Sequence, residues 1–108
     1  MVNDPANRRQ SPRTYPGVPL RIAIREKKFR LDNISSEGMG IAVEGPDVFF
    51  IGQRIDSIVF EGEDSRNPLN GIVSHISKDK HGYLCGIRFV FSGSRDFNYV
   101  KGLNLKLN

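Results

Sequence analysis

Alternation of apolar and polar residues with a period of two is the feature that most constrains the fold of this chain. In residues 18–25, Leu20, Ile22 and Ile24 fall on one face and the intervening residues fall on the other. Such alternation is typical of a half-buried β-strand. Five later segments have strand-like sequences bounded by turn residues, namely residues 29–34, 41–44, 54–62, 70–78 and 83–91. Six short strands about ten residues apart predict an all-β sandwich or small barrel.

The polar segment between the second and third predicted strands interrupts this alternation. In residues 29–34, the pattern places Asn33 on the face of Phe29 and Leu31, and it places Asp32 on the opposite face with Ile34. Residues 35–40 contain two serines and two glycines, so we expect a glycine-rich turn there.

The two ends of the chain differ from this central region. Residues 1–17 have no apolar period and contain three prolines, which predicts a mobile N-terminal arm before a barrel domain over residues 18–108. Near the other end, Ser94 could cap a helix whose apolar side carries Phe97, Val100 and Leu103 or Leu105. Gly102 and three asparagines oppose that helix, so a short C-terminal helix and an irregular segment both stay open.

The cysteine count and the apolar segments indicate in which cellular compartment the chain folds. Cys85 is the only cysteine, and with two histidines it makes a poor zinc set, so we expect a reducing compartment and no structural metal. The N-terminus is basic but lacks the apolar stretch of a signal peptide, and the apolar run at residues 48–51 is too short to span a bilayer. These features predict a cytoplasmic protein without a membrane span.

Positive charge is concentrated near the N-terminus. Residues 1–30 hold eight Lys and Arg but only two acidic residues, in a chain whose formal net charge is +4. This charge predicts a partner that carries phosphate groups. The alternative explanation is a basic face that only contacts solvent.

Two short motifs make that expectation specific. The arm contains Arg9-x-x-x-Arg13, and the end of the second predicted strand contains Asn33-x-Ser35-x-x-Gly38. Each motif alone is weak, but in this order and setting they resemble the PilZ domain family, the bacterial receptors for the second messenger cyclic di-GMP. The late segment CGIRF, residues 85–89, also resembles the closing strand of that family.

The resemblance implies a six-stranded Greek-key-like barrel, often followed by a helix, and a ligand site. It implies that Arg9 and Arg13 bind cyclic di-GMP from the arm, because a guanidinium can form paired hydrogen bonds with guanine O6 and N7 or with phosphate. Asn33 and Ser35 would hold the ligand from the barrel surface. Gly38 would keep the turn close, either because it lacks a Cβ or because it takes positive φ.

Two positions refine this expectation. In the family, an arginine just before the first motif is associated with two stacked ligand molecules, so Arg8 implies two cyclic di-GMP molecules per chain. Many members have Asp where this chain has Asn33, and a neutral amide accepts weaker hydrogen bonds than a carboxylate, so we expect weaker binding at worst.

The expected mechanism is that ligand orders the arm and thereby signals to a partner protein or a fused domain. Two alternatives are a general binder of single-stranded nucleic acid and a PilZ-fold interaction module without ligand. Such a nucleic-acid binder displays aromatic side chains along one sheet face, whereas the aromatic residues of these strands fall mostly on faces that we expect to be buried. We therefore expect no DNA or RNA partner.

Catalysis and metal binding lack supporting motifs. The sequence has neither a G-x-S-x-G elbow nor a phosphate-binding G-x-x-x-x-G-K loop, so an enzyme is not expected. His75 and His81 have no ligand-spaced partners, which favours structural or solvated roles, and Cys85 in an apolar strand is expected to be inert filling.

Overall fold

Six antiparallel strands close into a barrel, as the alternation of the sequence predicts. The structure is a computed structural model that describes residues 13–16, 20–62, 68–80 and 82–107. Around the barrel the strands follow the order β1-β2-β3-β6-β5-β4, and β4 pairs with β1 to close it. Three consecutive hairpin-connected strands with the fourth beside the first form a Greek key, so the predicted topology is confirmed. The strands are β1 (Arg21–Ile24), β2 (Lys27–Ile34), β3 (Gly38–Val43), β4 (Arg54–Phe60), β5 (Leu69–Asp79) and β6 (Gly82–Val90).

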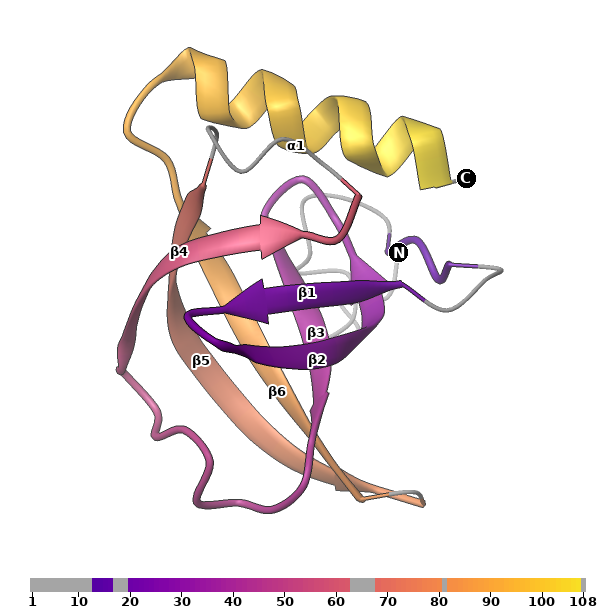
Figure 1. Cartoon of the computed structure of the whole chain (residues 1–108), viewed down its shortest axis with the longest axis vertical. Coiled ribbons are helices and arrows are strands. Elements are labelled where there is room, and N and C mark those ends of the chain that lie inside the picture. Colours follow the sequence, from indigo (N-terminus) through magenta and orange to yellow (C-terminus); the bar gives the residue numbers. More distant parts are fainter. Residues whose placement is uncertain (1–12, 17–19, 63–67, 81, 108) are drawn as a thin grey trace, which may run out of the picture.

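A helix, α1 (Ser94–Leu107), lies across the end of the barrel at the top of Figure 1. Val100 and Leu103 are buried in the same core as the inward-facing strand residues, so the helix closes that end of the barrel. Phe97 is 40% exposed and meets Phe91 edge-on at a centroid distance of 5.7 Å. Of the two alternatives for the C-terminal segment, the helix is confirmed.

The predicted alternation fails at one place in β2. A register shift between Leu31 and Asn33 marks a bulge in the pairing of β2 with β3. Beyond the bulge, Ile34 is fully buried and Asn33 is half-exposed, the reverse of the predicted faces. The prediction was wrong here because a bulge inserts an extra residue, and this shifts the later side chains to the other face.

The predicted glycine-rich turn at residues 35–40 is shorter than expected. β3 begins at Gly38, so the second half of the predicted turn is strand. Gly38 and Gly40 pair with Arg88 and Gly86 of β6, which places both glycines in the sheet.

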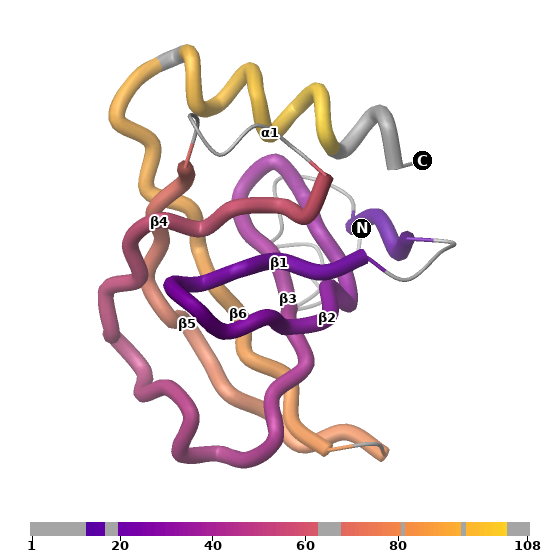
Figure 2. Tube along the Cα trace, viewed as in Figure 1, coloured from indigo at the N-terminus to yellow at the C-terminus, as the bar shows by residue number. Residues whose placement is uncertain are grey.

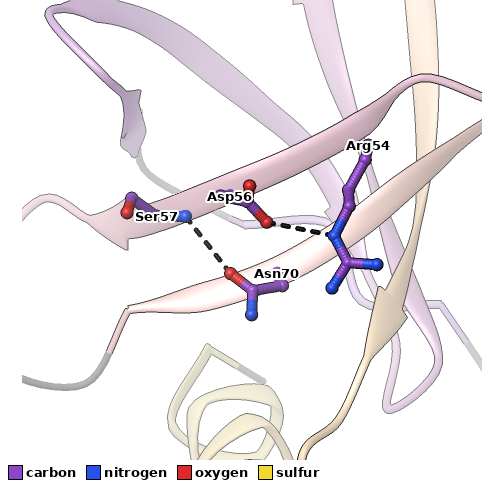
Figure 3. A network of polar contacts seen from close by, with 4 residues as sticks. All are labelled: Arg54, Asp56, Ser57 and Asn70. Atoms are coloured by element: carbon purple, nitrogen blue, oxygen red, sulfur yellow. Dashed lines mark hydrogen bonds and ion pairs between the residues drawn. The ribbon is translucent and has the colours of Figure 1, made fainter.

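A second irregularity lies in β4. A register shift between Ile55 and Ile58 accompanies a left-handed backbone at Ser57, whose φ is 60°. The backbone nitrogen of Ser57 donates to Oδ1 of Asn70 at 3.3 Å, as Figure 3 shows. Arg54 and Asp56 form an exposed ion pair in the same view, at 3.3 Å.

Candidate functional site

The turn between β2 and β3 is organised by Ser35. This residue is 2% exposed, and its Oγ accepts hydrogen bonds from the backbone nitrogens of Glu37 at 3.2 Å and Gly38 at 3.3 Å. The Ser35 nitrogen donates to the Gly38 carbonyl at 2.8 Å. The predicted site residue Ser35 therefore fixes the turn, and its contact with a ligand stays a prediction.

Gly38 allows β3 to approach β6 closely. A Cβ built on Gly38 would lie 2.5 Å from the carbonyl oxygen of Ile87, a distance that real side chains do not reach. Its φ is not in the left-handed region. Of the two reasons expected for this glycine, the missing Cβ applies and positive φ does not.

The end of the arm is tied to the end of β2. Thr14 is buried and pairs with Ile34 through two backbone hydrogen bonds, of 2.7 and 2.9 Å. Figure 2 shows this N-terminal segment, in indigo, on the side of the barrel where β2 ends. As a result, Nη1 of Arg13 donates to Oδ1 of Asn33 at 3.1 Å. The structure thus brings together one residue from each motif, although the predicted arm boundary at residue 17 stays a prediction.

Asp32 joins this pair from the same strand. Nδ2 of Asn33 donates to Oδ2 of Asp32 at 2.7 Å, so the two side chains meet. The expectation that Asp32 points to the opposite face from Asn33 was wrong. The bulge between Leu31 and Asn33 is the physical reason, because it breaks the alternation of the two residues.

Four residues from four strands form one row across the barrel surface. Asn33 pairs with Gly40, Gly40 pairs with Gly86, and Gly86 pairs with His75. Their chain neighbours Met39, Ile41, Cys85 and Ile87 are buried in the core, so the two glycines face outward. A Cβ on Gly40 would lie 2.7 Å from Nδ2 of Asn33, and one on Gly86 would collide with the ring of His75. The glycines therefore leave space that these two side chains occupy.

A polar groove of about 340 Å³ lies beside this row. Its lining combines the arm, the β2–β3 turn, β5 and β6. The residues are Arg13, Glu37, Gly38, Ser74, His75, Gly86, Ile87 and Arg88. The lining includes two arginines and one glutamate, so the groove favours an anion that also offers hydrogen-bond acceptors.

Sequence reasoning missed the contribution of β5 and β6. Ser74, His75 and Arg88 are distant from both motifs in sequence, and only the strand register brings them to the groove. The alternation in residues 83–91 does place Arg88 outside the core, which was the one available signal. Arg8 and Arg9, the other predicted ligand contacts, lie outside the described residues, as does His81.

Cys85 lies in the core and not in the groove. Burial raises the pKa of its thiol to about 11, so the thiol stays protonated at neutral pH. Within the described residues, no group of three or more His, Cys, Asp and Glu side chains could hold a metal ion.

A second hollow, of about 440 Å³, is apolar and lies at the other end of β2. Phe29, Val48 and Phe49 line it together with the basic residues Arg25 and Lys27. It includes none of the motif residues.

The sequence itself matches the PilZ domain family over residues 7–102. The chain belongs to the PilZ domain family. The match covers both motifs and the whole barrel, so the family predicted from the two motifs is confirmed. No curated protein is significantly similar to the chain in sequence.

Solved PilZ structures share the fold at low sequence identity. The chain is similar to the PilZ domain of YcgR from Escherichia coli, described with c-di-GMP, with a TM-score of 0.71 and 17% identity over 93% of this chain and 91% of that one. It is also similar to the K. pneumonia MrkH–c-di-GMP complex, with a TM-score of 0.73 and 14% identity over 99% of this chain. A third similar structure is the Bacillus subtilis inhibitor of motility MotI/DgrA, with a TM-score of 0.68 and 16% identity over 92% of this chain.

These similarities show the fold. The PilZ chain spans about half the length of MrkH and MotI, at 53% and 50%. Among the helices of the described chain, none combines the length and the apolar character needed to cross a bilayer.

Proposed function

We propose that this PilZ domain binds cyclic di-GMP in the polar groove. The observation that carries the proposal is the hydrogen bond between Arg13 and Asn33, because it joins the two ligand-binding motifs at one edge of the groove. Two of the similar PilZ structures are described with c-di-GMP, which supports the same ligand for this chain.

The groove has the chemistry that this ligand requires. Cyclic di-GMP carries two negative charges and two guanine bases, whose O6 and N7 atoms accept hydrogen bonds. Arg13 and Arg88 can donate to guanine or to phosphate oxygens through their planar guanidinium groups. Gly40 and Gly86 make room for the side chains of Asn33 and His75, which would offer the ligand further polar atoms beside the groove.

The arm would complete the site in this proposal. Arg9 would supply a second guanidinium of the first motif, and Arg8 would bind a second, stacked cyclic di-GMP molecule. Because Thr14 is anchored to Ile34, the described end of the arm, at Arg13, lies at the groove. Ordering of the arm on the ligand would create a new surface for a partner protein or a fused domain. The chain would act as a cytoplasmic receptor, with no catalytic step of its own.

The described residues give little support to the alternative of a general nucleic-acid binder. Sites of that kind stack bases on aromatic side chains along a sheet. The aromatic residues that are strongly exposed are Tyr15, Phe50 and Phe97, and none of them lies in a strand. Phe60 and Phe89, in the strands, are buried.

Isothermal titration calorimetry with cyclic di-GMP tests the proposal. Arg13→Ala should weaken binding by roughly 5- to 150-fold, which corresponds to a loss of about 1–3 kcal/mol for a paired guanidinium contact. Arg54→Ala is the matched control, because Arg54 is an exposed arginine of β4 outside the groove. The control should bind like the wild type, and the titration should give two ligands per chain.

The same titration separates the alternatives. Absence of binding by the wild-type chain, or equal weakening by both variants, would contradict the proposed site. Titration with a single-stranded oligonucleotide should give no comparable affinity at physiological salt. Tight oligonucleotide binding that falls steeply with salt would favour the nucleic-acid alternative.

A further inference from the structure

We propose that Asp32 is a positioning residue that fixes the orientation of the Asn33 amide and thereby sets the guanine preference of the groove. The inference rests on the proposed function for its ligand. It starts from a chain of two hydrogen bonds, in which Asn33 donates to Asp32 at 2.7 Å and accepts from Arg13 at 3.1 Å.

An asparagine side chain needs such positioning because its two ends differ. Its carbonyl oxygen only accepts hydrogen bonds and its NH₂ group only donates them, so a rotation by half a turn exchanges the two. An ionised carboxylate at the same position would present acceptors in both orientations. Asp32 only accepts, so it holds Nδ2 of Asn33 and leaves Oδ1 directed toward Arg13 at the groove. In this way Asn33, held by Asp32, presents an acceptor oxygen to the groove, as a carboxylate would.

Two features of the barrel hold this arrangement. The bulge between Leu31 and Asn33 lets the side chains of Asp32 and Asn33 meet, which regular alternation would prevent. Gly40, the partner of Asn33 on β3, provides the space for the amide, since a Cβ there would lie 2.7 Å from Nδ2. Both side chains are partly buried, so water competes less for the bond than it would on an exposed surface.

The fixed amide would discriminate between bases. The Watson–Crick edge of guanine offers two neighbouring N–H donors, and a carbonyl oxygen with two lone pairs can accept one of them while keeping Arg13. Adenine presents a ring nitrogen acceptor where guanine presents an N–H donor, so the oxygen of Asn33 would face another acceptor. We therefore expect the groove to prefer cyclic di-GMP over cyclic di-AMP partly because Asp32 holds the amide in place.

Replacement of Asp32 tests the inference, because positioning and long-range electrostatics predict opposite changes in ligand affinity. Removal of a carboxylate near a dianionic ligand should tighten binding if only long-range charge mattered. We expect Asp32→Ala instead to weaken cyclic di-GMP binding by about 3- to 10-fold, which corresponds to one modest hydrogen bond, and to reduce the preference over cyclic di-AMP. Asp56→Ala removes the same charge from an exposed site on β4, and it should leave the dissociation constant unchanged or slightly lower.

A rescue variant distinguishes positioning from a structural role. In the double variant Asp32→Ala/Asn33→Asp, residue 33 carries two acceptor oxygens and needs no orienting neighbour. Binding and guanine preference should return to within about twofold of the wild type. Affinity of Asp32→Ala equal to that of the wild type, or a double variant as weak as Asp32→Ala, would overturn the inference while the proposed function stands.

A ligand-free measurement keeps the two proposals separable. The side-chain NH₂ resonances of Asn33 in an NMR spectrum of the wild-type chain should be shifted and slowly exchanging, and in Asp32→Ala they should resemble those of a solvated amide. If the wild-type chain fails to bind cyclic di-GMP, the proposed function fails, and this spectrum still decides whether Asp32 orients Asn33. Identical Asn33 resonances in the two proteins would overturn the positioning role.

Discussion

Gly38 belongs to the second motif and is also required for the packing of the barrel. It ends the turn that Ser35 organises, and its missing Cβ lets β3 approach the backbone of Ile87. The sequence predicted a glycine requirement here but left its reason open. Only the position of β6, more than forty residues later in the chain, shows that close approach is the reason.

Gly38→Ala should therefore destabilise the barrel. The new methyl group would meet backbone, which cannot rotate away as a side chain can, so we expect a loss of about 1–3 kcal/mol in the free energy of unfolding. Gly45→Ala is the matched control because a Cβ there meets nothing within 4 Å. Urea denaturation of the two variants checks this, and equal stabilities would contradict the packing argument.

Cys85 gives a pH-dependent prediction at the same scale. Burial raises the pKa of its thiol from 9.0 to about 11, so above pH 9 the unfolded state loses this proton before the folded state does. The contribution of this thiol to the free energy of unfolding is constant below pH 9 and decreases as the pH rises toward 11. We expect the stability of the wild type relative to Cys85→Ala to fall by about 1 kcal/mol between pH 8 and pH 10. Urea denaturation at the two pH values measures it, and an unchanged difference would contradict the burial argument.

At the scale of elements, the six strands and their order along the chain followed from alternation and turn residues. The sequence could not predict the bulges in β2 and β4, because a bulge depends on the register with a partner strand. This is why Asn33 and Ile34 were assigned to the wrong faces. The groove residues of β5 and β6 were missed for a related reason, since register alone brings His75 to Gly86.

The hairpin between β1 and β2 contains one of the two non-glycine residues with positive φ in the described part of the chain. Ile24 pairs with Lys27, so Arg25 and Glu26 form a two-residue turn, and φ of Arg25 is 59°. A side chain in this left-handed region costs about 1–2 kcal/mol, part of which the greater unfolded-state freedom of glycine offsets. Arg25→Gly should thus raise the free energy of unfolding by about 0.5–1 kcal/mol.

Arg30→Gly is the matched control for this prediction. Arg30 is an exposed arginine within β2 with no positive φ, so glycine there should destabilise the strand by about 0.5–1 kcal/mol. Thermal unfolding, monitored by circular dichroism, compares the melting temperatures of Arg25→Gly and Arg30→Gly. A lower melting temperature for Arg25→Gly than for the wild type would contradict the strain argument.

At the scale of the whole molecule, the polar groove and the apolar hollow lie toward opposite ends of β2, and Arg13 and Gly38, one residue from each motif, line the groove. A ligand that binds only the folded state stabilises it by about 2.7 kcal/mol at a concentration of 100 times its dissociation constant. Saturating cyclic di-GMP should therefore raise the melting temperature of the wild type by several degrees. At the same ligand concentration, Arg13→Ala should show a clearly smaller shift, and equal shifts would contradict a role for Arg13.

The most direct test of the central claim is a pair of amide NMR spectra of the wild-type chain, without and with cyclic di-GMP. Binding in the groove predicts the largest shifts at Asn33, Gly38, Gly86 and Arg88, with little change at Arg25 and Phe49 of the apolar hollow. Unchanged spectra would contradict the receptor function. Shifts confined to the hollow would show that the ligand binds elsewhere on the barrel.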